Sequence, residues 1–123
     1  MSPASNPEFR VKRAYDAPET ADGRRVLVDR LWPRGVRKEW AHIDSWPKAL
    51  TPSTELRRWF HAEPGRRPEF EHRYRIELST PEAEAELANL RAAAADGPVT
   101  LVTAVRDAEH SHVPVLLSVL RSG

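Results

Sequence analysis

Residues 99–105, with the sequence VTLVTAV, constrain the fold of this chain more than any other stretch. The run is continuous, apolar and rich in β-branched residues, which is typical of a strand with little exposure to solvent. Residues 26–31 form a second run of this kind, and Pro33 and Gly35 follow it as strand-ending residues. Helical patterns separate the two runs, so the sequence predicts an α/β fold with a largely buried sheet.

Periodic apolar residues predict the helices. Ser53 is placed to cap a helix that shares Leu56 and Phe60 on one face, and Pro64 ends it. Further helical segments are predicted over residues 37–42, 67–78 and 81–95.

The final helix is predicted over residues 113–120, because apolar residues recur there at helical spacing. Pro114 fits the first turn of a helix, where amides have no intrahelical acceptor, so Ser111 is the expected cap. At the other end of the chain, Phe9 and Val11 alternate with charged residues, which predicts a strand with one face in solvent.

The chain has 123 residues, about the size of one domain with one core. Residues 1–7 are small, polar and interrupted by two prolines, which predicts a flexible leader. Residues 8–123 are expected to form a single α/β domain. We expect it to be small, layered and Rossmann-like, with a short, mostly parallel sheet flanked by helices.

The charge and the composition exclude several classes of function. Lys and Arg number 19 against 18 Asp and Glu, so the net charge of +1 gives no general attraction to nucleic acid or anionic membranes. The absence of cysteine excludes disulfides, thiolate zinc sites and cysteine nucleophiles. The sequence shows neither a signal region nor an apolar run of the roughly 20 residues that span a bilayer. We therefore expect a soluble, cytoplasmic protein without a membrane partner.

Charged and aromatic residues follow both predicted buried strands. Open α/β sheets bind ligands beyond the carboxyl ends of their strands, so these residues converge if the strands are parallel. The amides that open the final helix add positive potential there. We expect an arginine-rich pocket for an anion, such as a nucleotide or a phosphorylated small molecule. The expected ligand-binding residues are Arg30, Trp32, Arg34, Arg57, Arg106 and Ser111.

The sequence leaves open whether chemistry takes place in this pocket. His110 and His112 are candidates for proton transfer near neutral pH, and Asp29 is a candidate partner that orients one of them. No metal is expected, because a transition-metal site needs three or four convergent ligands. No cofactor is expected either, because the five glycines are scattered and form no phosphate-binding loop.

Structural interpretations compete with these roles. Asp29 and Arg30 can form internal ion pairs with Arg106 and Asp107. His112 can hydrogen-bond loop backbone instead of taking part in chemistry.

Two other functions are open. A protein-interaction module would use Trp40 or Trp46 as an exposed anchor. Nucleic-acid binding is disfavoured by the near-neutral charge and would require the paired basic residues to share one face. Those residues are Arg24, Arg25, Arg37, Lys38, Arg57, Arg58, Arg66 and Arg67.

Four stretches occur in the order that is found in the YeaO-like branch of the domain-of-unknown-function-488 family, which this chain resembles: VLVDRLWPRG, LTPSTELRRWF, FEHRYRIEL and VTLVTAVRDAEHSH. The resemblance spans residues 9–120. It implies a bacterial α/β, Rossmann-like domain without a settled activity. The broader family has cysteines where this chain has Thr103 and Ser111, so thiol chemistry does not transfer. The resemblance points to Asp29, Arg30, Trp32, Pro33, Arg34, Gly35, Ser53, Arg57, Trp59, Phe60, Arg106, Asp107, His110 and His112 as site residues.

Overall fold

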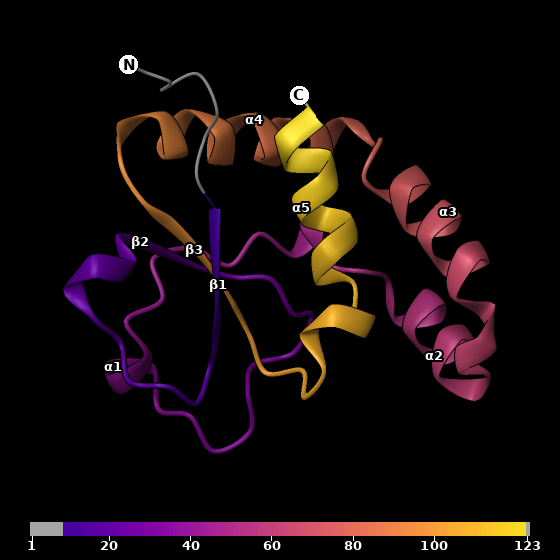
Figure 1. Cartoon of the computed structure of the whole chain (residues 1–123), viewed down its shortest axis with the longest axis horizontal. Coiled ribbons are helices and arrows are strands. Elements are labelled where there is room, and N and C mark those ends of the chain that lie inside the picture. The colour runs from indigo at the N-terminus through magenta and orange to yellow at the C-terminus, as the bar shows by residue number, and fades with distance from the viewer. Residues whose placement is uncertain (1–8, 123) are drawn as a thin grey trace.

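A three-stranded sheet lies at the centre of the computed structural model, which describes residues 9–122 (Figure 1). All pairings in it are parallel, and the strand order is β1-β3-β2. The fold is therefore α/β, as the sequence predicts, while the predicted leader over residues 1–7 lies outside the described residues. The strands are β1 (Phe9–Arg13), β2 (Arg24–Leu27) and β3 (Val99–Thr103).

Each helix that the sequence predicts is present. Figure 1 shows α2 and α3 side by side on one flank, α4 across one end, and α1 on the opposite flank. The α-helices are α1 (Lys38–Ala41), α2 (Thr54–Ala62), α3 (Arg67–Glu77), α4 (Pro81–Asp96) and α5 (Val113–Ser122). Short 3-10 helices are η1 (Thr20–Asp22), η2 (Lys48–Leu50), η3 (Pro64–Arg66) and η4 (Ala108–His110).

Serine hydroxyls stabilise the first turns of α2 and α5. The Ser53 Oγ accepts a hydrogen bond from the Leu56 amide at 3.1 Å, so the predicted cap of α2 is confirmed. The Ser111 Oγ accepts from the Val113 amide at 3.1 Å and donates to a carbonyl in η4 at 2.7 Å. Ser111 therefore satisfies an amide that has no acceptor within α5.

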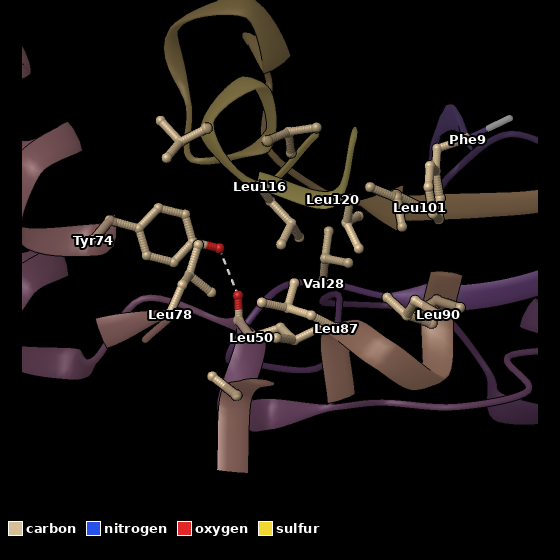
Figure 2. Packing of buried hydrophobic residues seen from close by; sticks show 14 of the residues in the cluster. Phe9, Val28, Leu50, Tyr74, Leu78, Leu87, Leu90, Leu101, Leu116 and Leu120 are labelled. Carbon is tan, nitrogen blue, oxygen red and sulfur yellow. Dashed lines mark hydrogen bonds between the residues drawn. The ribbon is translucent and has the colours of Figure 1, made fainter. Parts of the chain in front are cut away.

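The main core lies between one face of the sheet and helices α3, α4 and α5 (Figure 2). Leu101 of β3 and Leu116 of α5 are fully buried within it. At its edge the hydroxyl of Tyr74, also fully buried, donates a hydrogen bond to the carbonyl of Leu50 at 2.5 Å, drawn as the dashed line in Figure 2. The apolar faces of α3 and α5 thus pack into one core.

The other face of the sheet carries a buried ionic cluster beside its apolar side chains. The Asp22 carboxylate accepts from Nη1 of Arg25 at 2.7 Å and lies 3.1 Å from Nζ of Lys12. Burial opposes the ionisation of Asp22, but hydrogen bonds from the Glu19 backbone, Lys12 and Arg25 outweigh it and lower the pKa of Asp22. The Arg25 Nε also donates to the Ala41 carbonyl at 2.8 Å, so the cluster fastens η1 and α1 to the sheet.

The predicted bounds of the strand at residues 26–31 are wrong. β2 begins two residues earlier and is shorter, although Val28 still donates to a carbonyl of β3 at 3.0 Å. Leu31 is 64% exposed and lies outside the sheet. The chain leaves the sheet at Asp29 because this carboxylate, rather than the backbone, makes the next hydrogen bonds to the end of β3.

Candidate ligand-binding site

A cavity of about 700 Å³ opens where the chain leaves β2 and β3 at their carboxyl ends. This is the position at which open parallel sheets bind ligands. The apolar part of its wall consists of Leu31, Trp32, Pro33, Pro52, Phe60, Phe70, Ala104 and Val105. The polar part consists of Asp29, Arg30, Arg34, Arg57, His61, Arg67, Asp107, His110, Ser111 and His112.

Of the six expected ligand-binding residues, Arg106 does not reach the cavity, and three residues to which the family resemblance points also do not line it: Gly35, Ser53 and Trp59. Arg106 is exposed and does not line the wall, although its neighbours Val105 and Asp107 do. The chain bends at Arg106, and this bend leaves the side chain in solvent. Arg67, at the start of α3, lines the cavity instead.

Arg30 is held in place by the segment that precedes α2. Its Nε donates to Oγ1 of Thr51 and to the carbonyl of Pro52, both at 3.1 Å. Thr51 is itself fixed because its hydroxyl donates to the Lys48 carbonyl at 2.8 Å. Within residues 9–122, the two terminal nitrogens of Arg30 have no hydrogen-bond partner, so they are available to a ligand.

Two tryptophans fix the loop that carries Arg30 and Arg34. The Trp32 Nε1 donates to the Val36 carbonyl at 2.6 Å, and the Trp46 Nε1 donates to the Asp29 carbonyl at 2.7 Å. The two indole rings meet edge to face at 5.7 Å. Trp32 is half-buried and lines the cavity, whereas the Arg34 side chain lies exposed at its rim.

Helices α2 and α3 supply the remaining basic side chains of the wall. Arg57 and His61, one turn apart on the same face of α2, both line the cavity. The Arg67 Nε lies 3.1 Å from a Glu71 oxygen, and its Nη1 donates to the His110 carbonyl at 2.7 Å. In the described part of the chain, the Arg57 guanidinium has no such partner.

Asp29 links the carboxyl ends of β2 and β3 through hydrogen bonds. Its carboxylate accepts hydrogen bonds from the Thr103 hydroxyl and the Ala104 amide, both at 2.7 Å. The alternative ion pairs of Asp29 with Arg106 and of Arg30 with Asp107 are not formed among residues 9–122. The Asp29 carboxylate is therefore held by the last residue of β3 and by the residue that follows it.

His112 is 8% exposed and lies against the same carboxylate. Its Nε2 is 2.7 Å from the Val28 carbonyl and 3.6 Å from Oδ1 of Asp29. Burial lowers the pKa of His112, and the charges of Arg57 and Arg67 lower it further, against the opposing effects of Asp29 and the Val28 hydrogen bond. The ring is thus neutral at pH 7 and hydrogen-bonds backbone, as the structural interpretation predicts.

His110 and Asp107 form a separate pair at the rim. The His110 Nδ1 is 2.7 Å from an Asp107 oxygen, and both side chains are largely exposed. The hydrogen bond from His110 lowers the pKa of Asp107. Among residues 9–122, no three His, Cys, Asp or Glu side chains gather as metal ligands do.

The basic residues considered for nucleic-acid binding do not form one free surface. Arg25 is 2% exposed and paired with Asp22. Arg66 stacks on the ring of Trp59 at 4.8 Å and lies 3.5 Å from a Glu63 oxygen. Of the two proposed anchor residues for a protein partner, Trp40 is 41% exposed. Trp46 is half-buried and hydrogen-bonds the Asp29 carbonyl.

Each helix of the described chain is too short or too polar to cross a membrane.

The chain matches one protein family over nearly its whole length. The family model described as "Inactive DUF488-N3 subclade" matches residues 8–123. The chain belongs to this family. The resemblance to the YeaO-like branch, predicted from four motifs, is thereby confirmed.

Relatives in this family cover almost the whole chain. Uncharacterized protein YeaO of Escherichia coli (strain K12) is 43% identical over 111 residues, which are 90% of this chain and 95% of the relative. Uncharacterized protein Rv3073c of Mycobacterium tuberculosis (strain ATCC 25618 / H37Rv) is 45% identical over 111 residues, which are 90% of this chain and 92% of the relative. No solved structure matches the chain.

Proposed function

We propose that this protein binds an anionic small molecule, a nucleotide or another phosphorylated metabolite, in the cavity beyond β2 and β3, and does not convert it. The observation that carries the proposal is that Arg30, Arg34 and Arg57 line a cavity whose wall also contains eight apolar side chains. Guanidinium groups bind phosphate and carboxylate through parallel hydrogen bonds, and apolar surroundings strengthen such contacts.

The distribution of internal partners supports a net positive cavity. Asp29 is satisfied by Thr103 and Ala104, and Arg67 is paired with Glu71. Arg57 has no partner within residues 9–122. Arg30, Arg34, Arg57 and Arg67 line the cavity together with the carboxylates Asp29 and Asp107, so the formal charge of the wall is positive even when Glu71 offsets Arg67, and this charge would attract an anion.

Binding without turnover is supported by the state of the candidate catalytic groups. The His112 Nε2 is engaged with the Val28 carbonyl, and burial keeps the pKa of His112 low. His110 is paired with Asp107 at the exposed rim. The chain has no cysteine, and the description of its family as an inactive subclade agrees with a binding role.

Titration calorimetry with inorganic phosphate, ribose 5-phosphate and adenosine 5′-monophosphate tests this function. Arg57→Gln and Arg58→Gln form a matched pair, because the two residues are adjacent on α2 and Arg57 lines the cavity while Arg58 is exposed away from it. Removal of a charged hydrogen bond costs about 1.5–3 kcal/mol, so Arg57→Gln is expected to weaken binding roughly ten- to hundredfold.

Arg58→Gln is expected to leave the affinity of the parent protein unchanged. The proposal is wrong if the parent protein binds none of the three compounds. It is also wrong if both substitutions weaken binding equally, because the anion would then be attracted by surface charge and not held in the cavity.

A further inference from the structure

The Nδ1 atom of His112 restricts the class of molecule that the cavity can bind. A carbonyl oxygen only accepts hydrogen bonds, so the short contact with Val28 places the proton of the neutral ring on Nε2. Nδ1 is then an acceptor with a free lone pair. The carbonyl of Val28, the residue that follows β2, therefore fixes the tautomer of His112.

Nδ1 has no hydrogen-bond partner among residues 9–122, and the side chain is more than nine-tenths buried. Among the same residues, Nη2 of Arg25 is the one side-chain nitrogen or oxygen that is both fully buried and without a hydrogen-bond partner. Since Nδ1 of His112 also lacks a partner, it does not belong to the fully buried atoms. Nδ1 is therefore not enclosed by protein atoms. His112 lines the cavity, so a ligand in the cavity would be the group that reaches an accessible Nδ1.

An anion that filled this space without a donor group would bury the acceptor unsatisfied, which opposes binding. We propose that the ligand is a hydroxylated or N–H-bearing organic anion, in which a phosphate or carboxylate meets Arg30 and Arg57 and a hydroxyl or N–H donates to Nδ1 of His112. This inference rests on the proposed function and adds a donor to the anion. The chemical class is that of sugar phosphates and related polyol phosphates.

Two probes of nearly equal shape separate the donor from the anion. Ribose 5-phosphate and tetrahydrofurfuryl phosphate share the five-membered ring and the phosphate, and the second lacks every ring hydroxyl. An unsatisfied buried acceptor costs about 1–3 kcal/mol, so ribose 5-phosphate is expected to bind about tenfold more tightly.

His112→Gln tests whether His112 is the origin of that preference. The glutamine amide can still donate to the Val28 carbonyl, but no acceptor is left at the position of Nδ1. The two probes are expected to bind this variant with affinities within about twofold of each other.

A spectroscopic measurement on the parent protein does not depend on how the variant folds. In the ¹⁵N spectrum of the histidine rings, the free Nδ1 of His112 is expected to shift toward the value of a hydrogen-bonded nitrogen with ribose 5-phosphate. It should not shift with tetrahydrofurfuryl phosphate.

Equal affinities with an unmoved Nδ1 resonance would overturn the donor inference and leave anion binding intact. A preference that survives in His112→Gln would overturn it as well, because the hydroxyl would then be bound elsewhere. Failure of the parent protein to bind either probe would overturn the inference and the proposed function together.

Discussion

At the level of single residues, His112 links the cavity to the stability of the fold. Its neutral ring joins the first residue after β2 to the start of α5 through the Val28 carbonyl. The charged groups that face it are Asp29, which favours protonation, and Arg57 and Arg67, which oppose it. Burial dominates, so the folded protein binds a proton at His112 less readily than the unfolded chain does.

This difference makes the folded protein sensitive to mild acid. The pKa of His112 is lower in the folded state than in the unfolded state, near 6.5, so its contribution to stability is complete above that value and is lost as the pH falls toward the folded pKa. We expect the free energy of unfolding, measured with urea between pH 7 and pH 5, to fall by up to about 1.4 kcal/mol per pH unit.

His112→Gln should remove most of this slope, whereas the same substitution at the exposed His72 should retain it. A slope that is unchanged in His112→Gln would show that the ring is not held neutral by the fold.

Single residues also show what the sequence could predict of the site. Asp29, Arg30 and Arg34 follow the general rule that ligand-binding residues come after the strands of an open parallel sheet. Arg67 was missed because it reaches the cavity from the start of another helix, and strand-end reasoning does not extend to it. Arg106 follows the rule in sequence, but the bend in its backbone turns it to solvent.

At the level of elements, the helices were predictable and the ends of the strands were not. Ser53 and Pro64 mark α2 through local chemistry that sequence displays directly. The end of β2 is set by the carboxylate of Asp29 binding the Thr103 hydroxyl, a contact across 74 positions of sequence. Such a tertiary contact has no local signature.

The turn that leads into β2 depends on a glycine. Gly23 has a φ of +64°, and a Cβ there would lie 2.2 Å from the Pro98 carbonyl oxygen. Gly35 has a φ of +79° with no atom within 4 Å of the corresponding position. Both residues have a positive φ, which favours glycine. Of the two positions, only Gly23 would also bring an added β-carbon into overlap with another atom.

Gly35→Ala is therefore expected to destabilise the protein by about 1–2 kcal/mol, the ordinary cost of a left-handed conformation. Gly23→Ala is expected to cost at least about 4 kcal/mol, because β2 and the segment before β3 must also move apart. Urea denaturation of the two variants measures the difference. Equal losses would mean that the turn at Gly23 is free to relax.

At the level of the whole molecule, the strand order creates the cavity. β3 is the last strand in the chain, yet it lies between the first two, so the loops after β2 and β3 open at the same edge. Helices α2 and α3 then cover this edge from one flank (Figure 1). The sequence indicates the α/β class through its buried strands, but pairing partners depend on contacts between distant segments and could not be inferred from it.

Whether an anion occupies this edge is decided by a crystal structure of the protein grown with ribose 5-phosphate. We expect the phosphate within hydrogen-bond distance of Arg30 and Arg57, with a ring hydroxyl directed at Nδ1 of His112. A cavity without the sugar phosphate, or a phosphate bound only to exposed arginines such as Arg58 and Arg106, would contradict the proposed function.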